Sequence, residues 1–206
     1  MIGCRAVTRE EVTRLLAMAD RLFCESVSHR LKAMIVLAMA TGLRIQEIRT
    51  LRCGDICTAG RCGESVYARR TNMKAKRAGR RVPLSNTARE HIQAWLDYSG
   101  LGSDSTAYLF PPAKGSWSHK PLYWSDRCLD DRSARKNLDA LIHACELSGH
   151  VSWHSFRKYF AGEFYRRSGN NLIATRSAMG HSRIDSTMSY LASDDSEVAA
   201  LILQLT

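Results

Sequence analysis

The N-terminal part of the chain has the hydrophobic spacing of helices. Thr8 followed three residues later by Glu11 is a capping-box pattern, and it predicts the start of a helix. One face of this helix would carry the apolar residues Val12, Leu15, Leu16 and Ala19. A second helix is predicted from Ser28 to about Ala40, and its apolar content indicates burial. Thr41-Gly42 would end that helix. A short third helix would contain Ile45, Ile48 and Leu51.

Residues 54 to 84 have a different pattern. Glycines separate short segments of extended character, which run over residues 64–70 and 80–84. These segments predict a small antiparallel sheet. Ser85 would then cap a helix, because it directly precedes an apolar face with helical spacing. That face consists of Ala88, Ile92, Trp95 and Leu96.

The second half of the chain predicts shorter helices. Residues 111–121 begin and end with proline and are expected to form a loop. A helix follows that contains Leu138, Leu141, Ile142 and Ala144. Breaks are expected at 149–150, at 169–171 and at Gly180. Residues 193–206 predict a tail helix with an apolar stripe of Val198, Leu201, Ile202 and Leu205. The expected fold class is mostly α with one small antiparallel β-sheet.

The composition excludes two classes of protein. With 206 residues and 45% hydrophobic content, the chain can bury a core, so it is not a disordered protein. The longest apolar run, from Ala33 to Ala40, has eight residues, whereas a membrane span needs about 20. The first residues contain no apolar signal region. A cytoplasmic protein without a membrane partner is therefore expected.

The seven cysteines are odd in number and scattered, which favours reduced thiols over a disulfide framework. Cys53, Cys57 and Cys62 lie close together in the sequence and raise the question of a zinc site. A zinc site usually has a fourth ligand and C-x-x-C pairs, and neither is visible here. Small buried or loop thiols are the preferred interpretation.

The charge indicates a polyanionic partner. The formal net charge is +10, and residues 66–81 contain seven basic residues and no acidic one. A solvated face normally mixes both signs, so this block favours nucleic acid, whose phosphates attract Lys and Arg. We expect phosphate contacts from Arg69, Arg70, Lys76, Arg77, Arg80 and Arg81.

Four fragments carry the candidate chemistry. They are Ala40-Thr41-Gly42-Leu43-Arg44-Ile45-Gln46-Glu47-Ile48, Arg80-Arg81-Val82-Pro83-Leu84, Trp153-His154-Ser155-Phe156-Arg157, and Met179-Gly180-His181-Ser182-Arg183 with Tyr190 nine residues after the histidine. In order and content they resemble the tyrosine recombinases, also called the phage integrase family. The T-G-L-R-x-x-E-I string, the H-x-x-R pair and the G-H-S string before a tyrosine are that family's catalytic boxes. They extend over about 150 residues here.

The resemblance implies an enzyme that cleaves and rejoins double-stranded DNA through a 3′-phosphotyrosyl intermediate. Tyr190 would be the nucleophile, and its hydroxyl needs activation because its ordinary pKa is about 10. Arg44 and Arg157 would bind the phosphate, since guanidinium offers a planar pair of donors. His154 and Arg157 share a helix face at i and i+3. His154 would donate to a phosphate oxygen or accept the proton of Tyr190.

Two further catalytic roles follow from the resemblance, and a structural one follows from the position of Glu47 three residues after Arg44. His181 would donate to the same phosphate. The general acid for the leaving 5′-oxygen would be a lysine of the basic hairpin, for which Lys74 is preferred and Lys76 is the alternative. Glu47 is assigned to structure, where it would orient Arg44 or brace the helix. No metal or nucleotide cofactor is implied, because arginines take the metal's place and the covalent bond stores the energy.

The domain organisation differs from that of most members. Most carry a separate N-terminal domain on the other side of the DNA, but only about 40 residues precede the first box here. We therefore expect residues 1–206 to be one catalytic domain without a core-binding domain. The chain would be a single-domain member, similar in length to the fimbrial-switch invertases, or a fragment; the initial Met favours the former.

Recombination implies self-association on DNA, from dimer to tetramer. Accessory proteins, the DNA target and the biological outcome are not readable from the sequence. Two other functions stay open. A type IB topoisomerase-like enzyme would use the same residues as a monomer, and a non-catalytic DNA-binding protein would keep the pocket only to bind phosphate.

Overall fold

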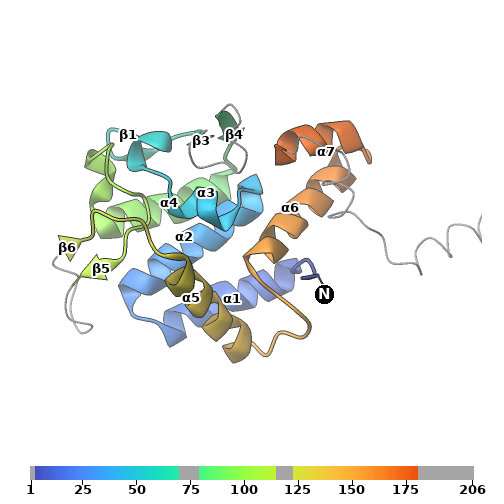
Figure 1. The fold of residues 1–206 in the computed structure, drawn as a ribbon, viewed down its shortest axis with the longest axis horizontal. Helices are drawn as coiled ribbons and strands as arrows, with labels where there is room; N and C mark the ends of the chain where they lie inside the picture. The colour runs from blue at the N-terminus through green and yellow to red at the C-terminus, as the bar shows by residue number, and fades with distance from the viewer. Residues whose placement is uncertain (1–2, 70–78, 115–122, 181–206) are drawn as a thin grey trace, which may run out of the picture. The chain divides into compact units, whose positions relative to one another are not determined.

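The computed structural model describes residues 3–69, 79–114 and 123–180 (Figure 1). The chain divides into two compact units, residues 1–160 and 161–206. In the first unit, helix α2 (Glu25–Thr41) is the central element. It packs against α4 (Asn86–Ser99) and α1 (Arg9–Leu22), and α1 also contacts α5 (Asp131–Ala144).

The predicted start of α1 is confirmed. The Thr8 hydroxyl accepts from the Glu11 backbone N–H at 3.2 Å, and the Glu11 carboxylate accepts from the Thr8 N–H at 2.9 Å. The buried face of the helix consists of Val12, Leu15 and Ala19, as the periodicity predicts, whereas Leu16 is only partly buried.

Helix α2 is longer at its N-terminus than predicted, because Cys24 occupies the N-cap position and Glu25 already lies in the first turn. Its buried positions lie on all sides, which agrees with the central place of the helix. Gly42 ends it in the left-handed conformation, with a φ of 61°. The short helix α3 (Ile45–Arg49) follows at once, and Leu51 lies beyond its end.

The predicted small antiparallel sheet is confirmed as a pair of strands, β3 (Ser65–Ala68) and β4 (Arg80–Pro83), in which Val66 opposes Val82. Two further antiparallel pairs occur in the described residues. After the turn η1 (Cys53–Asp55), β1 (Cys57–Thr58) and β2 (Arg61–Cys62) form a tight hairpin, and β5 (Ala113–Lys114) pairs with β6 (Tyr123–Trp124). The β5–β6 pair corrects the expectation that residues 111–121 form a loop, because β5 lies within that range.

The core of the first unit is a single hydrophobic cluster. Among its largest fully buried side chains are Leu15, Met34, Leu37, Ile48, Trp95, Phe110 and Phe156. The Trp95 indole also donates to the Leu109 carbonyl at 2.6 Å, so the polar atom of this buried ring is satisfied. Ser85 caps α4 as predicted, and α4 is followed by the turn η3 (Leu101–Ser103).

Helix α6 (Trp153–Arg167) begins in the first unit and ends in the second. The second unit also contains α7 (Leu172–Met179), which Asn171 caps through its side chain. Gly169, Asn170 and Gly180 have positive φ, so the predicted breaks are found. The predicted tail helix, 193–206, lies outside the described residues. None of the helices in the described part of the chain combines the length and the apolar character that a membrane-spanning segment needs.

Candidate active site

The turn between α2 and α3 fixes the first of the candidate catalytic residues. The Thr41 hydroxyl donates to the Leu37 carbonyl at 2.6 Å and accepts from the Leu43 N–H at 3.3 Å. Gly42 supplies the left-handed turn, and Leu43 is buried in the core. The apolar neighbours of Arg44 therefore anchor the backbone on both sides of it, because Ile45 is buried as well.

Arg44 is held at this turn by Glu47. The Glu47 carboxylate accepts from the Arg44 backbone N–H at 2.6 Å, and its other oxygen lies 3.6 Å from a guanidinium nitrogen of Arg44. The side chain of Glu47 is 4% exposed, whereas that of Arg44 is 32% exposed. Glu47 therefore braces the start of α3 and orients Arg44 at the same time, while Arg44 keeps access to solvent.

The start of α6 presents the second group of candidates. Ser152 and Ser155 close the first turn reciprocally, since the Ser155 N–H donates to the Ser152 carbonyl at 2.8 Å and the Ser152 N–H donates to the Ser155 hydroxyl at 3.0 Å. The Trp153 indole donates to the Ala134 carbonyl of α5 at 3.1 Å. His154 and Arg157 then follow one helical turn apart, as the H-x-x-R spacing predicts.

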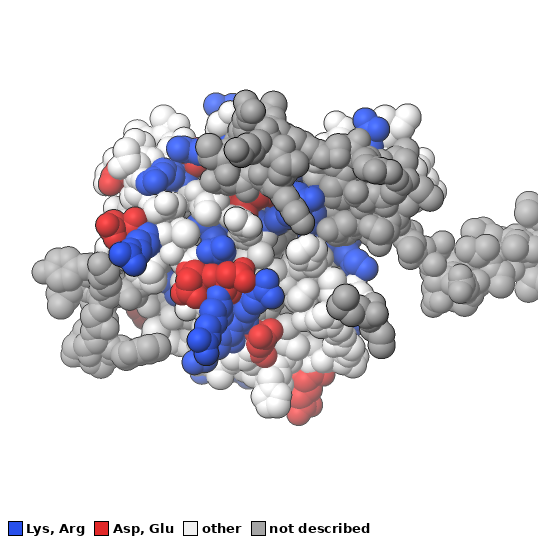
Figure 2. Space-filling view, viewed as in Figure 1, with Lys and Arg blue, Asp and Glu red and all other residues white. Residues whose placement is uncertain are grey.

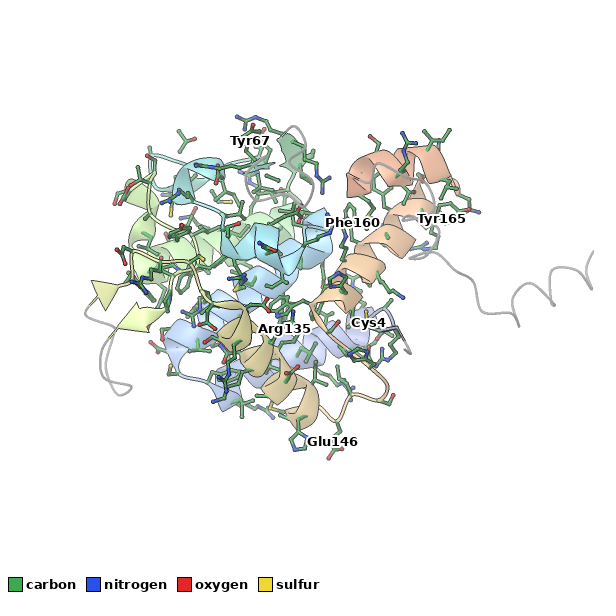
Figure 3. The ribbon with its side chains drawn as sticks, in the orientation of Figure 1. Cys4, Tyr67, Arg135, Glu146, Phe160 and Tyr165 are labelled. Carbon is green, nitrogen blue, oxygen red and sulfur yellow. The ribbon has the colours of Figure 1, made fainter. Side chains whose placement is uncertain are left out.

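Arg157 joins α6 to the α2–α3 turn. Its side chain is almost completely buried, and one guanidinium nitrogen donates to the Gly42 carbonyl. Phe160, one turn further along α6, lies against the same glycine, so closely that a Cβ at Gly42 would overlap its ring (Figure 3). Residues 41–45 and 153–160 therefore meet, although more than 100 positions separate them in the sequence.

His154 lies in a positively charged environment. The side chain is exposed, but the protein atoms around its ring desolvate it in part, and this lowers its pKa below the usual value. The charges of Arg157, Arg44, Arg135 and Lys158 lower the pKa further. The lowered pKa favours the neutral imidazole at pH 7, and a neutral imidazole can accept a proton at one nitrogen and donate one from the other.

The basic hairpin does not present a uniform face. Along β4, Arg80 and Val82 turn inward while Arg81 and Pro83 are exposed. Burial lowers the pKa of Arg80, whose charge interacts with Glu47 and Arg44. Arg80 therefore belongs to the surroundings of Arg44, a neighbourhood that the sequence interpretation missed. The alternation along the strand, with buried Val82 two positions away, was the signal that could have revealed it.

The other described arginines of the hairpin region differ from each other. Arg69 forms an ion pair with Asp55 at 2.6 Å, and the Asp55 side chain is 2% exposed. Arg81 lies over the ring of its cross-strand neighbour Tyr67, 5.7 Å from the ring centre. On the face drawn in Figure 2, the described Lys and Arg residues are interleaved with Asp and Glu. The basic block at residues 66–81 contains no acid, but in the fold Asp55, from outside the block, pairs with Arg69.

Half of the predicted site residues lie outside the described residues. These are Lys74, His181 and Tyr190 among the catalytic candidates, and Arg70, Lys76 and Arg77 among the DNA contacts. Of the described candidates, the fold brings Arg44, His154, Arg157 and Arg80 together. Arg69 and Arg81 lie further along the hairpin, at its strands.

The three neighbouring cysteines are close in space. Cys57 and Cys62 oppose each other in the β1–β2 hairpin, and the thiols of Cys53 and Cys57 share a hydrogen bond. Burial raises the pKa of the Cys62 thiol to about 11. Within the described ranges, no three His, Cys, Asp or Glu side chains are arranged to hold a metal ion. All seven cysteines are free.

The described fold is mostly helical, and in it a Thr-Gly-Leu-Arg turn contacts a helix that carries a His-x-x-Arg pair. The profile of the Phage integrase family matches residues 5–197, so the chain belongs to this family. It is similar to the tyrosine recombinase XerC of Erythrobacter litoralis, with 27% identity over 96% of this chain and 58% of the relative. The chain thus spans about half the length of the curated relatives it matches.

Solved structures show the same fold. The XerH site-specific recombinase bound to its difH substrate, in a pre-cleavage complex, has a TM-score of 0.65 and 19% identity over 96% of this chain and 53% of that chain. The catalytic domain of the bacteriophage HP1 integrase has a TM-score of 0.58 and 17% identity over 97% of this chain and 94% of that domain. The predictions of family and fold class are therefore confirmed.

Proposed function

We propose that the chain is a site-specific DNA recombinase, or the catalytic domain of one, that cleaves and rejoins double-stranded DNA through a 3′-phosphotyrosyl intermediate. The observation that carries the proposal is the meeting of Arg44 with His154 and Arg157 around the Gly42 turn. Two distant sequence motifs build one cationic site there. The extent of the match to the HP1 integrase catalytic domain supports assigning residues 1–206 to that domain.

The proposed chemistry uses only side chains of this chain. Tyr190 attacks the scissile phosphorus, the bond to the 5′-oxygen breaks, and Lys74 protonates that oxygen, with Lys76 as the alternative acid. Arg44, Arg157 and His181 stabilise the charge that develops on the nonbridging oxygens. Phosphodiester bond energy is retained in the tyrosyl phosphate, so a 5′-hydroxyl from a partner duplex can reverse the step.

The neutral state of His154 supports a specific part for it. A neutral imidazole can accept the Tyr190 proton as the nucleophile attacks, whereas an imidazolium can only donate. A DNA phosphate adds negative charge beside the ring and raises its pKa on binding. Both roles left open by the sequence, acceptor and donor, are therefore available at pH values near neutrality, and the pH dependence of cleavage distinguishes them.

Trapping on suicide DNA tests the proposal. After attack, a nicked substrate loses the short piece that carries the freed 5′-hydroxyl. Religation is then impossible, so the covalent adduct accumulates. The wild-type chain should form this adduct, and Tyr190→Phe should bind the same DNA with unchanged affinity and form none. An adduct with the Phe variant would refute Tyr190 as the nucleophile, and failure of the wild-type chain on a panel of relatives' sites would favour the non-catalytic DNA-binding alternative.

Self-association on DNA, from dimer to tetramer, is part of the proposal, because strand exchange joins two duplexes. The apolar stripe predicted for residues 193–206 is the segment proposed to support it, in cis or in trans. Deleting 194–206 should weaken assembly on paired sites more than binding to a single site, as measured by native gel shift. Relaxation of a plasmid by a monomer, without pairing of sites, would instead favour the topoisomerase alternative. The DNA substrate implies a place of action in the cytoplasm, at the nucleoid.

A further inference from the structure

The segment that leads into α6 is fixed from the N-terminal end of the chain. Residues 145–152 connect α5 to α6, and Glu146 and Gly149 both have positive φ, 51° and 72°. Ser148, Gly149 and His150 are exposed, so packing does not hold them. Leu147 and Val151 on either side of this stretch are buried in the core, so the polar contacts of residues 148–150 fix its path between them into the first turn of α6, where His154 lies.

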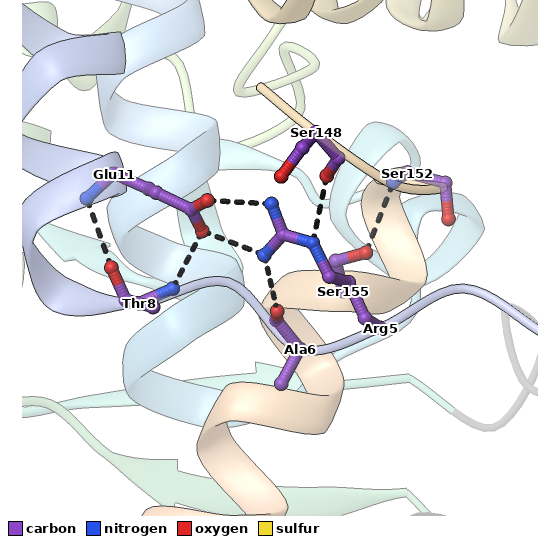
Figure 4. A network of polar contacts seen from close by, with 7 residues as sticks. All are labelled: Arg5, Ala6, Thr8, Glu11, Ser148, Ser152 and Ser155. Carbon is purple, nitrogen blue, oxygen red and sulfur yellow. Dashed lines mark hydrogen bonds and ion pairs between the residues drawn. The ribbon is translucent and has the colours of Figure 1, made fainter.

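Arg5 supplies those contacts (Figure 4). Its backbone N–H donates to the His150 carbonyl at 3.0 Å, and its Nε donates to the Ser148 carbonyl at 2.9 Å. The side chain lies directly over Gly149, where a Cβ would be 3.2 Å from Nε. Arg5 thus contacts the carbonyls on both sides of Gly149, which leaves room for the arginine side chain because it has no Cβ.

Arg5 is itself held by α1. Its two terminal nitrogens donate to the two oxygens of Glu11 at 2.8 and 2.5 Å, a bidentate arrangement that fixes the plane of the guanidinium. Glu11 is the same residue that closes the capping box with Thr8. An ion pair with one partner 33% exposed contributes little to overall stability, which makes orientation the main consequence of this geometry.

We propose that Arg5, held by Glu11, is a positioning residue that sets the start of α6 and thereby the distance of His154 from the arginines of the site. The inference rests on the proposed function for its catalytic consequence, but not for its structural one. Releasing Arg5 loosens residues 148–150, and the exposed side of the first turn of α6, where His154 lies, then shifts relative to the α2–α3 turn, while Trp153 and Phe156 stay in the core.

The titration of His154, followed by NMR of the imidazole and assigned with His154→Gln, tests the structural part. Arg5→Gln removes a positive charge and Glu11→Gln removes a negative one, so purely electrostatic effects would shift the pKa of His154 in opposite directions. Release of α6 shifts it upward in both variants, toward the ordinary value of about 6.5. Arg9→Gln and Glu10→Gln on α1 also remove one positive and one negative charge. They leave the contacts of Arg5 with Glu11 and with residues 148–150 intact and therefore serve as matched controls.

The cleavage rate constant at saturating suicide DNA tests the catalytic part. It should fall about ten- to hundredfold in Arg5→Gln, with less loss in Arg5→Lys, while the affinity for DNA equals that of Arg9→Gln. Opposite shifts of the His154 pKa in Arg5→Gln and Glu11→Gln, or titrations identical to those of the controls, would overturn the proposal. If the wild-type chain forms no adduct, the proposed function fails while the NMR comparison still decides the positioning role. Should Arg5→Gln not fold, Glu11→Gln decides by itself, because release raises the pKa of His154 whereas loss of the negative charge alone would lower it.

Discussion

The α2–α3 turn and the β3–β4 hairpin both contribute arginines to the candidate site, but they fix them in different ways. At the turn, Arg44 and Arg157 are tied to backbone and carboxylate groups inside a dense scaffold. On the hairpin, the three described arginines have different environments: Arg80 turns inward, Arg81 covers an aromatic ring and Arg69 pairs with an acid. A motif with buried apolar residues between its polar ones specifies side-chain geometry, whereas a run of like charges specifies only composition.

The largest expected effect concerns the hairpin, where the general acid is proposed. Lys74→Ala should slow cleavage of ordinary DNA about 10²- to 10⁴-fold, because the 5′-oxygen leaves without a proton. A substrate with a 5′-bridging sulfur should restore the rate, since the thiolate leaves without protonation. Rates are measured on suicide DNA, with Lys76→Ala as the matched control. Rescue of Lys76→Ala and not of Lys74→Ala would move the role two residues along.

The turn should be most sensitive at Gly42. Gly42→Ala places a Cβ on a backbone with positive φ, at a cost of about 1–2 kcal/mol, and overlap with the Phe160 ring adds about 1–3 kcal/mol. Gly100 ends α4 with a φ of 71° and has nothing near its missing Cβ, so Gly100→Ala should cost the backbone part alone. Urea unfolding measures both. Equal losses would mean that α6 does not press on the turn.

The reach of sequence reasoning follows the same division. The capping box at Thr8, the glycine end of α2 and the β3–β4 pairing were predictable because each depends on neighbouring residues or on a simple alternation. The meeting of the turn with α6 was suggested only by family resemblance, since no local pattern relates residues 42 and 157. The order of the motifs therefore predicted more of the site geometry than the hydrophobic periodicity did.

Long-range polar pairing was the main omission. The ion pair of Arg69 with Asp55 joins residues that lie in different sequence patterns, one in a basic block and one in a glycine-containing turn. The bracket formed by Arg5 across residues 148–150 is of the same kind. Such contacts depend on the folded path of the backbone. The pairing of β5 with β6 was missed for a different reason: these strands have two residues each, too few for a periodic signal.

A smaller effect should separate Arg81 from Arg69. Arg81→Gln should reduce the slope of log K against log salt by about 0.9, as expected for one lost phosphate contact. Arg69→Gln should change that slope less, because Asp55 already neutralises the charge, but should cost about 1–3 kcal/mol of stability by leaving a buried carboxylate without its partner. Fluorescence anisotropy over a salt series and urea unfolding give the two quantities. The reverse ranking would mean that the ion pair opens to bind DNA.

The smallest effect is the pH dependence carried by His154. Its pKa in the folded chain lies below the unfolded value of about 6.5, so the unfolded state takes up a proton first as the pH falls. His154 therefore leaves stability unchanged above that value and lowers it as the pH falls through the folded pKa. The pKa of His91 is lowered as well, so the contribution of His154 to stability is isolated as the difference between wild type and His154→Gln.

The cleavage rate of the wild-type chain over the same pH range shows which role the His154 ring has. If neutral His154 accepts the Tyr190 proton, the cleavage rate falls as the pH falls. The midpoint of this fall lies above the pKa that His154 has without DNA, because the bound phosphate raises that pKa. A rate that stays level through this range would assign His154 as a donor to phosphate oxygen.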